Sequence, residues 1–450
     1  MINLREIIIG ALMDIVEEEQ YSHIVLKDVL EKYQYLDKRD RAFITRVTEG
    51  TLENMLQMDY IIERFSKVKV ENMKLVIRNI LRMSVYQLKY MDSVPASAAC
   101  NEAVKLAKKK GFGQLSGFVN GVLRGVSRGL DQLTYPKESV DAVKAWSVRY
   151  SMPEWIVAQW IGDYGKERTK EILAASLLEA PITVRANLER ITPEALAERF
   201  KVEGVTAVPL DTEKYPGLSY VYTIFGFDHL NGLSSFKEGL FYVQDPASRL
   251  AVLAAGAKPG MKVLDCCAAP GGKSFAAAIA MENQGEIVSC DLHPHKKKLI
   301  QAGADRLGLT IISPKTADGK VFRPEWENAF DLVLVDAPCS GLGVIRKKPD
   351  IRYKDPAPLA DLPAVQLDIL RNAARYVKPG GTLMYSTCTL LYRENGEVVE
   401  TFLAENKSYK AETFTLPGPV GPVQSGSVTL WPHRHGTDGF FISKMRREEG

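Results

Sequence analysis

Apolar residues recur at three- and four-residue spacing along the first 130 residues of the chain, as in "VIRNILRMSVYQLKYM" at 76–91. Such spacing puts the apolar side chains on one face of a helix. Few helix breakers occur before Pro95, and a Gly-rich turn at 111–113 then separates two further helices, of which the second ends near Gly129. The pattern predicts an all-α N-terminal domain over residues 1–135.

The pattern changes twice in the remainder of the chain. Residues 136–240 contain a linker, a Trp-rich helical region and short strand-like runs such as "ITVRANL" at 182–188, which predict a small connecting α/β subdomain. From residue 241 onward, apolar runs alternate with helical stretches that start near Lys273, Pro294, Pro358 and Tyr392. The five apolar runs are "MKVLDC" at 261–266, "EIVSCD" at 286–291, "TIIS" at 310–313, "DLVLVD" at 331–336 and "GTLMYST" at 381–387.

Alternating strands and helices indicate a parallel sheet covered on both faces, so residues 241–450 are predicted to form a C-terminal α/β Rossmann-like domain. The tail "GSVTLWPHRHGTDGFFISKMRR" at 426–447 predicts a closing hairpin. Sheets of this kind bind ligands at the carboxyl ends of their strands. Residues that directly follow the apolar runs are therefore the candidates for chemistry.

Composition narrows the class of protein. The chain has 450 residues, of which 46% are hydrophobic and 25% charged, and this is ordinary for a multidomain globular protein. No run of 18 apolar residues occurs, and Glu6, Asp14 and residues 17–19 give the N-terminus a helix pattern rather than that of a signal peptide. The six cysteines lack zinc-ligand spacing. We expect a cytoplasmic protein with reduced cysteines, without a metal and without a membrane span.

Charge is unevenly distributed in the N-terminal domain, although the net charge of the chain is only +3. Residues 1–63 hold 7 Lys/Arg and 13 Asp/Glu, a net of −6, whereas residues 64–128 hold 13 Lys/Arg and 3 Asp/Glu, a net of +10. A basic block beside an acidic one suggests a one-sided positive face for nucleic acid. A solvated helical surface is the alternative.

"VLDCCAAPGGKS" at 263–274 combines a strand, a Gly-rich turn and a helix start. Small residues let the backbone approach a ligand closely, and the helix N-terminus offers free N–H groups. The stretch is not a P-loop, because that motif requires Gly where Cys267 stands, and it is not G-x-G-x-x-G either.

Acidic residues follow the strands around this turn. Asp291 lies 26 residues after Asp265, where a carboxylate can accept hydrogen bonds from both hydroxyls of a ribose. Asp318 follows the third strand, where it can accept from an adenine amino group, and Asp336 ends the fourth strand. A ring of acids suits a nucleoside with a cationic end, as in S-adenosylmethionine, better than a dinucleotide. Asp also often caps turns and helices without binding any ligand.

Two cysteines, Cys339 and Cys388, lie just past the ends of two predicted strands. Carbon 5 of cytosine becomes nucleophilic enough to take a methyl group only after a thiolate has added to carbon 6. That chemistry needs an attacking cysteine, an acid near ring N3 and a group that drives elimination, which Asp336 and the two cysteines can supply. Residue chemistry alone leaves open which cysteine attacks, and a cysteine is also often just a small buried hydrophobe.

A basic stretch follows Cys339 directly. "IRKKPDIRYK" at 345–354 offers Arg346, Lys347, Lys348, Arg352 and Lys354 as a grip for RNA phosphates.

The motifs "DCCAAPGGKS", "DAPCSG" and "YSTCT" resemble the hallmark motifs of the NOL/NOP2/Sun family of RNA cytosine-5 methyltransferases. In the N-terminal part, "DKRDRAFITRV" and "GFVNGVLRG" resemble a NusB-like RNA-binding domain. The combination, which covers nearly the whole chain, is similar to the bacterial 16S rRNA methyltransferase B branch, called RsmB, Sun or Fmu.

The resemblance implies roles for residues of this chain. Cys388 is the nucleophile, Cys339 is tied to product release, and Asp336 holds the base at N3, with Lys273 beside it among the catalytic residues. The implied target is cytosine 967 of 16S rRNA. The implied S-adenosylmethionine site consists of Cys267, Ala268, Ala269, Pro270, Gly271, Gly272, Lys273, Asp291, Asp318 and Asp336.

For RNA binding we expect Lys108, Lys109, Lys110, Arg346, Lys347 and Lys348 to contribute, in a protein that acts as a monomer. Two alternatives stay open. One is methylation of another RNA, such as tRNA or a different rRNA site. The other is a non-catalytic RNA-binding assembly factor with a vestigial fold.

Overall fold

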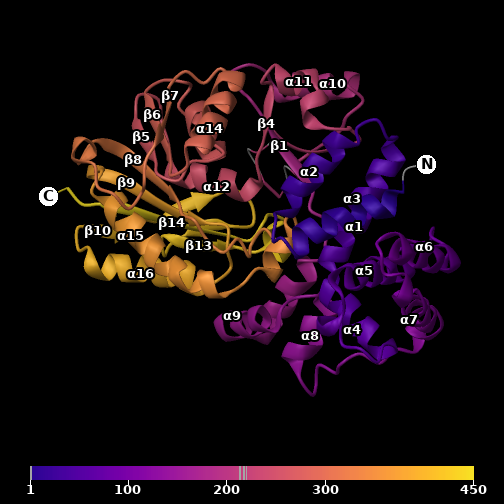
Figure 1. Ribbon diagram of the computed structural model, residues 1–450. Helices are drawn as coiled ribbons and strands as arrows, with labels where there is room; N and C mark the ends of the chain where they lie inside the picture. The colour runs from indigo at the N-terminus through magenta and orange to yellow at the C-terminus, as the bar shows by residue number, and fades with distance from the viewer. Residues whose placement is uncertain (1–2, 212–213, 216–217, 219, 450) are drawn as a thin grey trace. The chain divides into compact units, whose positions relative to one another are not determined.

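A computed structural model describes residues 3–211, 214–215, 218 and 220–449. The chain divides into two compact units, shown with their elements in Figure 1. The first comprises Met1–Leu178 together with Ile345–Lys354, and the second comprises Glu179–Val344 together with Asp355–Gly450. In the described part of the chain, every helix is too short or too polar to cross a membrane.

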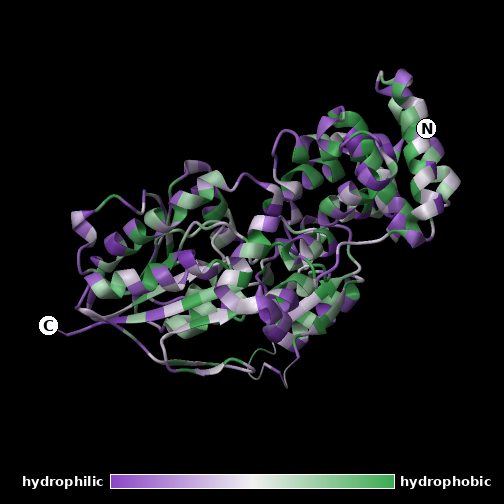
Figure 2. Ribbon diagram, turned by 90° about the horizontal axis from the view of Figure 1, so that it is seen from below, coloured by the Kyte–Doolittle hydropathy of each residue, from purple (hydrophilic) through white to green (hydrophobic). Residues whose placement is uncertain are grey.

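The first unit is all-helical, as the three- and four-residue spacing predicts. Side chains of Asn3, Asp37 and Asp141 cap α1, α3 and α8 by accepting a backbone N–H of the first turn. Most helices carry both hydrophobic and hydrophilic stretches, as Figure 2 shows. The helices are α1 Leu4–Val16, α2 Ser22–Lys32, α3 Lys38–Glu53, α4 Met55–Phe65, α5 Leu75–Tyr90, α6 Ala96–Lys109, α7 Ser116–Gly129, α8 Ala142–Tyr150 and α9 Glu154–Ala175.

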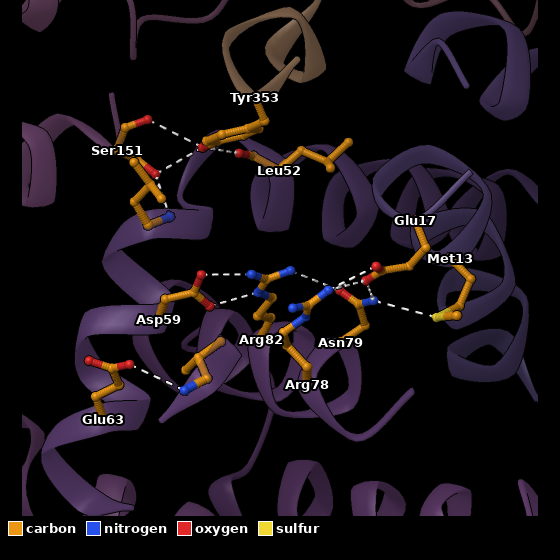
Figure 3. A network of polar contacts seen from close by, with 12 residues as sticks. Met13, Glu17, Leu52, Asp59, Glu63, Arg78, Asn79, Arg82, Ser151 and Tyr353 are labelled. Atoms are coloured by element: carbon orange, nitrogen blue, oxygen red, sulfur yellow. Dashed lines mark hydrogen bonds and ion pairs between the residues drawn. The ribbon is translucent and has the colours of Figure 1, made fainter. Parts of the chain in front are cut away.

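Charged groups are also buried in this unit, on the central helix α5. The Arg82 guanidinium donates to both carboxylate oxygens of Asp59, at 2.6 and 2.7 Å, and to the Asn79 side chain at 3.3 Å (Figure 3). Arg78 pairs with Glu17 at 2.8 Å. Since a buried charge is tolerated only when it is paired, this network ties α5 to α1 and α4.

The segment 345–354 packs within the helical unit, although it directly follows the Cys339 loop in the sequence (Figure 3). The Tyr353 hydroxyl donates to the Leu52 carbonyl oxygen at 2.7 Å and lies 3.0 Å from the Ser151 hydroxyl. Arg352 is fully buried and donates to the Ser151 carbonyl oxygen at 3.2 Å. The prediction that Arg352 grips a phosphate is therefore wrong, because its guanidinium is enclosed by protein.

A small α/β subdomain opens the second unit, as predicted, but the Trp-rich helices α8 and α9, which were predicted to be part of it, belong to the first unit. The antiparallel sheet of the subdomain has the strand order β2-β3-β1-β4, and Leu196 and Phe200 of α10 pack on Val184 and Phe241. Its elements are β1 Ile182–Ala186, α10 Pro193–Val202, β2 Thr206–Pro209, β3 Val221–Phe225, α11 Ser234–Lys237 and β4 Phe241–Val243.

The larger sheet of this unit has the strand order β10-β14-β9-β8-β5-β6-β7. Strands β9, β8, β5, β6 and β7 are parallel, whereas β14 runs antiparallel to β9 and pairs with β13 as the predicted hairpin. The sheet is thus mixed, not purely parallel. Its strands are β5 Lys262–Asp265, β6 Glu286–Asp291, β7 Ile312–Thr316, β8 Phe330–Asp336, β9 Val377–Thr387, β10 Tyr409–Ala411, β13 Ser427–Leu430 and β14 Phe440–Arg447.

Helices cover both faces of this sheet. Helices α12 and α14 lie on one face, and α15 and α16 lie on the other (Figure 1). Successive strand residues alternate between the two sides: Val263 packs with α12–α14, whereas Leu264 packs with α15 and α16. The other elements are α12 Pro246–Ala255, α13 Gly272–Ala280, α14 Pro294–Leu307, α15 Leu362–Ala374, α16 Gly396–Glu405, α17 Pro432–His435 and the separate hairpin β11 Phe414–Leu416 with β12 Gly421–Val423. The predicted fold class is confirmed.

Candidate active site

The strand order brings the two cysteine loops together. Strand β8 lies between β5 and β9, and Asp336 at its end is in register with Ser386 of β9. Cys339 and Cys388 follow these residues by three and two positions, and their Sγ atoms lie 3.4 Å apart. Both side chains are partly buried. All six cysteines lie among the described residues, and none is joined in a disulfide.

The Gly-rich turn between β5 and α13 lies beside them. The backbone N–H of Ala268 donates to the Cys290 carbonyl oxygen at 2.7 Å, which fixes the turn against the end of β6. Gly271 has a φ of +114°, and a Cβ atom there would collide with the Phe275 ring. The turn therefore needs glycine at this position. Residues 267–272 form the tight turn that the sequence predicts.

Lys273, in the first turn of α13, reaches across to the end of β8. Its ammonium lies 2.6 Å from Asp336 Oδ2, and the Ser386 hydroxyl donates to Asp336 Oδ1 at 2.8 Å. Lys273 Nζ also lies 4.9 Å from the centre of the Phe440 ring. Both carboxylate oxygens of Asp336 thus have a donor, one of them a cation, directly between the turn and the cysteine loops.

Asp265, at the end of β5, is fully buried. Its Oδ2 accepts from the Ser274 hydroxyl at 2.7 Å, and its Oδ1 has no hydrogen-bond partner among the described residues. Burial raises the pKa of this carboxyl from 3.8 to about 7. The unpartnered oxygen leaves one acceptor beneath the Gly-rich turn.

Asp291 and Asp318 follow the next two strands. Asp291 Oδ1 accepts the His293 N–H at 3.1 Å and lies 3.6 Å from Lys296 Nζ, and Asp318 Oδ1 accepts the Lys320 N–H at 2.9 Å. Each carboxylate thus accepts a backbone N–H from two residues further along. This is the turn-capping role that was the alternative to ligand binding. A small cavity beside Asp318 is lined by Leu264, Cys266, Cys290, Ala317, Trp326, Asn372 and Tyr376.

The acids act together on the turn. Burial, followed by the charges of Asp265, Asp336 and Asp291, raises the pKa of the Cys267 thiol well above its ordinary value. Of these three carboxyl groups, Asp336 is paired with Lys273, and Asp291 lies 3.6 Å from Lys296 Nζ. No group of three or more His, Cys, Asp or Glu side chains suited to a metal ion occurs among the described residues.

The two cysteines differ in what surrounds them. Its hydrogen bond with Cys388, together with burial, holds the pKa of the Cys339 thiol well above its ordinary value. Either sulfur can be the donor in this contact, so one thiol of the pair can donate a hydrogen bond to the other in its thiolate form. The pair can stabilise a thiolate on Cys388.

Sequence reasoning missed several polar residues that support this site: Ser386, Gln366, Glu394 and Asn395. Ser386 lies within the quoted "YSTCT" motif, two residues before Cys388. Because side chains alternate between the two faces of a strand, this spacing could have indicated that Ser386 lies on the same face as Cys388. Glu394 and Asn395 follow the Cys388 loop, in a position typical of a helix cap. Nothing in the sequence distinguishes Gln366 from a surface residue of α15.

The residues predicted to bind RNA all belong to the helical unit. Lys108, Lys109 and Lys110 are exposed at the end of α6, and Glu6 pairs with Lys109 at 2.6 Å and with Lys110 at 3.4 Å. Arg346, Lys347 and Lys348 are half-buried in the segment 345–354. Their role in RNA binding stays a prediction.

Three known families match three successive parts of the chain. The family described as 16S rRNA methyltransferase RsmB/F matches residues 252–446, and the NusB family matches residues 2–128. A ferredoxin-like domain of RsmF/B-like methyltransferases matches residues 152–214.

Individual proteins are similar over almost the full length. The probable ribosomal RNA small subunit methyltransferase B of Bacillus subtilis is 39% identical over 452 residues, which cover 99% of both chains. The ribosomal RNA small subunit methyltransferase B of Klebsiella pneumoniae is 28% identical over 450 residues, which cover 99% of this chain and 98% of that one. The crystal structure of a protein named PH0851 superposes with a TM-score of 0.82 at 25% identity, and covers 99% of both chains.

Proposed function

Because the chain belongs to the RsmB/F family of 16S rRNA methyltransferases, we propose that it methylates carbon 5 of a cytosine in 16S rRNA through a cysteine adduct. The observation that carries this proposal is the pair of thiols 3.4 Å apart beside the Lys273–Asp336 contact. A methyltransferase that acts on an exocyclic nitrogen or a ribose hydroxyl has no need of a thiol nucleophile, and still less of two.

The residues around the Gly-rich turn fit S-adenosylmethionine. The carboxyl groups of Asp265, Asp291 and Asp336 can accept hydrogen bonds from the ammonium and ribose groups of this ligand. Among the described residues, one buried oxygen of Asp265 has no hydrogen-bond partner. Residues 267–273 would hold the methionine end, Asp291 the ribose and Asp318 the adenine. When bound, S-adenosylmethionine supplies the electrophilic methyl group.

The protein's own residues perform the remaining steps. Cys388 Sγ adds to carbon 6 of the cytosine, and this makes carbon 5 nucleophilic. Asp336, held by Lys273 and Ser386, orients the base at its N3 side. After carbon 5 has taken up the methyl group, a solvent water accepts the proton of carbon 5. The electron pair of that C–H bond re-forms the double bond between carbons 5 and 6, and Cys388 leaves carbon 6 as a thiolate. Cys339 assists this elimination.

The assignment of the two cysteines follows the family resemblance, and their mutual contact is compatible with it. The two sulfurs lie within hydrogen-bond distance, so in the proposed roles the Cys339 thiol donates a hydrogen bond to the Cys388 thiolate. During elimination, the same hydrogen bond stabilises the leaving thiolate.

A denaturing gel of covalent RNA–protein adducts tests the proposal. The wild type, Cys388→Ala and Cys339→Ala are each incubated with S-adenosylmethionine and transcribed 16S rRNA. We expect an adduct that survives denaturation to accumulate with Cys339→Ala and none to form with Cys388→Ala. The reverse pattern would exchange the two roles, and absence of any adduct, even on 5-fluorocytosine RNA, would contradict the thiolate mechanism.

We further propose cytosine 967 as the target, in a cytoplasmic protein that acts as a monomer. Of the predicted domain boundaries, 135 lies inside the first compact unit, which runs to Leu178, and 240 lies inside the second. Bisulfite mapping of 16S rRNA from a deletion strain tests the target. Loss of 5-methylcytosine at another rRNA or tRNA position instead would assign the enzyme to that RNA. Calorimetric titration with S-adenosylmethionine distinguishes an RNA methyltransferase, whichever its target, from a non-catalytic assembly factor. The assembly factor should not bind S-adenosylmethionine.

A further inference from the structure

Glu394, in a short turn after the Cys388 loop, is fully buried and faces the Cys339 loop. Its Oε2 accepts the backbone N–H of Ser340 at 2.9 Å and the side-chain N–H of Gln366 at 2.8 Å. The same Gln366 nitrogen donates to the Pro338 carbonyl oxygen at 2.9 Å. Glu394, directly and through Gln366, therefore holds both residues that flank Cys339.

Asn395, the next residue, contacts the other cysteine loop in the same manner. Its Nδ2 donates to the Thr389 carbonyl oxygen at 3.0 Å, and its Oδ1 accepts from the Thr387 hydroxyl. These two threonines flank Cys388. Asn395 occupies the N-cap position of α16, yet its side chain makes no capping hydrogen bond there. Its hydrogen bonds go to the cysteine loop instead.

The two loops are also linked to each other. The hydroxyls of Ser340 and Thr389 lie 2.7 Å apart, and Thr389 Oγ1 accepts the Leu391 N–H at 3.2 Å. The Gly343 N–H donates to the Cys388 carbonyl oxygen at 2.9 Å. The distance between the two sulfurs is thus defined by a buried polar framework, since neither loop can shift without breaking several of these bonds.

This framework costs stability. Glu394 Oε1 is buried without a hydrogen-bond partner among the described residues, and a buried, partly satisfied carboxylate is less stable than an apolar side chain of similar volume. An arrangement of this kind is expected where geometry matters more than stability.

From these contacts we infer that Glu394 and Asn395 are positioning residues for two different steps of the reaction. Glu394 sets Cys339 for release of the product, and Asn395 sets Cys388 for attack on carbon 6. The inference rests on the proposed function, because it assigns the two contacts to the two proposed roles. It goes beyond that function by predicting opposite effects for substitutions at adjacent residues.

The adduct gel and the rate of methyl incorporation, measured with full-length protein, S-adenosylmethionine and transcribed 16S rRNA, test the inference. Glu394→Ala should accumulate the covalent adduct, as Cys339→Ala does, with turnover lowered on the order of 100-fold, as a misplacement of about 1 Å implies. Glu394→Gln should restore release, since its amide oxygen still accepts the Ser340 N–H. Asn395→Ala should lose both the adduct and turnover.

The matched control is Glu397→Ala, which makes the same chemical change at an exposed position three residues further along and should behave as wild type. Thermal unfolding shows which variants fold. Should Glu394→Ala fail to fold, Gln366→Met replaces it and should accumulate the adduct to a smaller extent. Should Asn395→Ala fail to fold, Thr387→Val replaces it and should form less adduct than the wild type.

The outcomes separate this inference from the proposed function. If Cys339→Ala accumulates the adduct but the Glu394 and Asn395 variants lose adduct and turnover alike, or match wild type, the positioning roles are overturned and the proposed function stands. If Cys339→Ala, Cys388→Ala and wild type all form no adduct, the proposed function itself is overturned.

Discussion

The Lys273 ammonium lies 2.6 Å from the Asp336 carboxylate, across 63 residues of sequence. This contact joins the first turn of α13 to the end of β8. Only 10% of the Lys273 side chain and 30% of the Asp336 side chain are exposed. Water therefore screens this pair less than a surface ion pair, and loss of one partner leaves the other charge in a poorly solvated place.

Lys273→Met should lower the rate of methyl transfer on the order of 100-fold, because Asp336 loses the cation that holds it in the position from which it is proposed to orient the base. Single-turnover incorporation of labelled methyl groups into 16S rRNA measures the effect. Lys378→Met is the matched control: Lys378 pairs with Asp331 at 2.8 Å, but the two side chains are 42% and 33% exposed. That change should cost at most about 1 kcal/mol in stability and leave the rate unaltered. Equal rates for the two variants would contradict the role of Lys273.

The stability of the second unit should depend on pH through Asp265. Burial raises its pKa to about 7 in the folded chain, above the ordinary 3.8, so the folded state holds a proton that the unfolded state has already lost between these values. The stability that this group contributes is present below pH 3.8 and is lost as pH rises through 7.

Asp265→Asn removes that dependence, and its amide oxygen can still accept from the Ser274 hydroxyl. The melting temperature of the variant, relative to that of the wild type, should therefore rise between pH 5 and pH 8, as measured by calorimetry at both values. A difference in melting temperature that stays constant over this range would show that Asp265 does not titrate there.

Gly343→Ala should disturb the cysteine loops. The Gly343 N–H donates to the Cys388 carbonyl oxygen, and the Gly439 N–H donates to the Gly343 carbonyl oxygen, both at 2.9 Å. A Cβ atom at Gly343 would collide with the Gly439 carbonyl oxygen, and such overpacking costs about 1–3 kcal/mol. Thermal unfolding and the adduct gel measure the result.

Gly121→Ala, on the exposed side of α7, provides the comparison. No atom lies within 4 Å of a Cβ added there, so the substitution should stabilise the helix by about 0.5–1 kcal/mol. If Gly343→Ala is as well tolerated as Gly121→Ala, the loops have more freedom than their contacts imply.

Neutralising Lys108, Lys109 and Lys110 together should weaken RNA binding and flatten its salt dependence, by about one unit of log–log slope for each phosphate that a lysine no longer neutralises. Binding isotherms at several salt concentrations measure both quantities.

Glu6→Gln provides the opposite test. It frees Lys109 and Lys110 from their ion pairs with Glu6 and should strengthen binding. Unchanged affinity and slope in both variants would exclude this end of α6 from the RNA-binding surface.

Much of the fold follows from local pattern. The apolar runs that end in Asp291 and Asp336 are strands β6 and β8, and the helix expected near Pro294 begins there. The strand predicted from "TIIS" at 310–313 starts too early, because β7 begins at Ile312. The Asn283 side-chain oxygen accepts hydrogen bonds from the backbone N–H groups of Thr310 and Ile311, so these groups do not pair with a strand. A hydrogen bond from a distant residue left no trace in the local pattern.

The sequence by itself determined the helices, most strand positions and the placement of Cys339 and Cys388 after strands, because the spacing of apolar residues reflects which side of each element faces the core. Tertiary structure decided that β8 lies between β5 and β9, and only this order brings Lys273 to Asp336 and Cys339 to Cys388. It also buried Arg352 within the helical unit, where sequence reasoning expected a phosphate contact. Strand order and burial of a charged group depend on pairing between segments far apart in the chain, and residue spacing within one segment carries no information about that pairing.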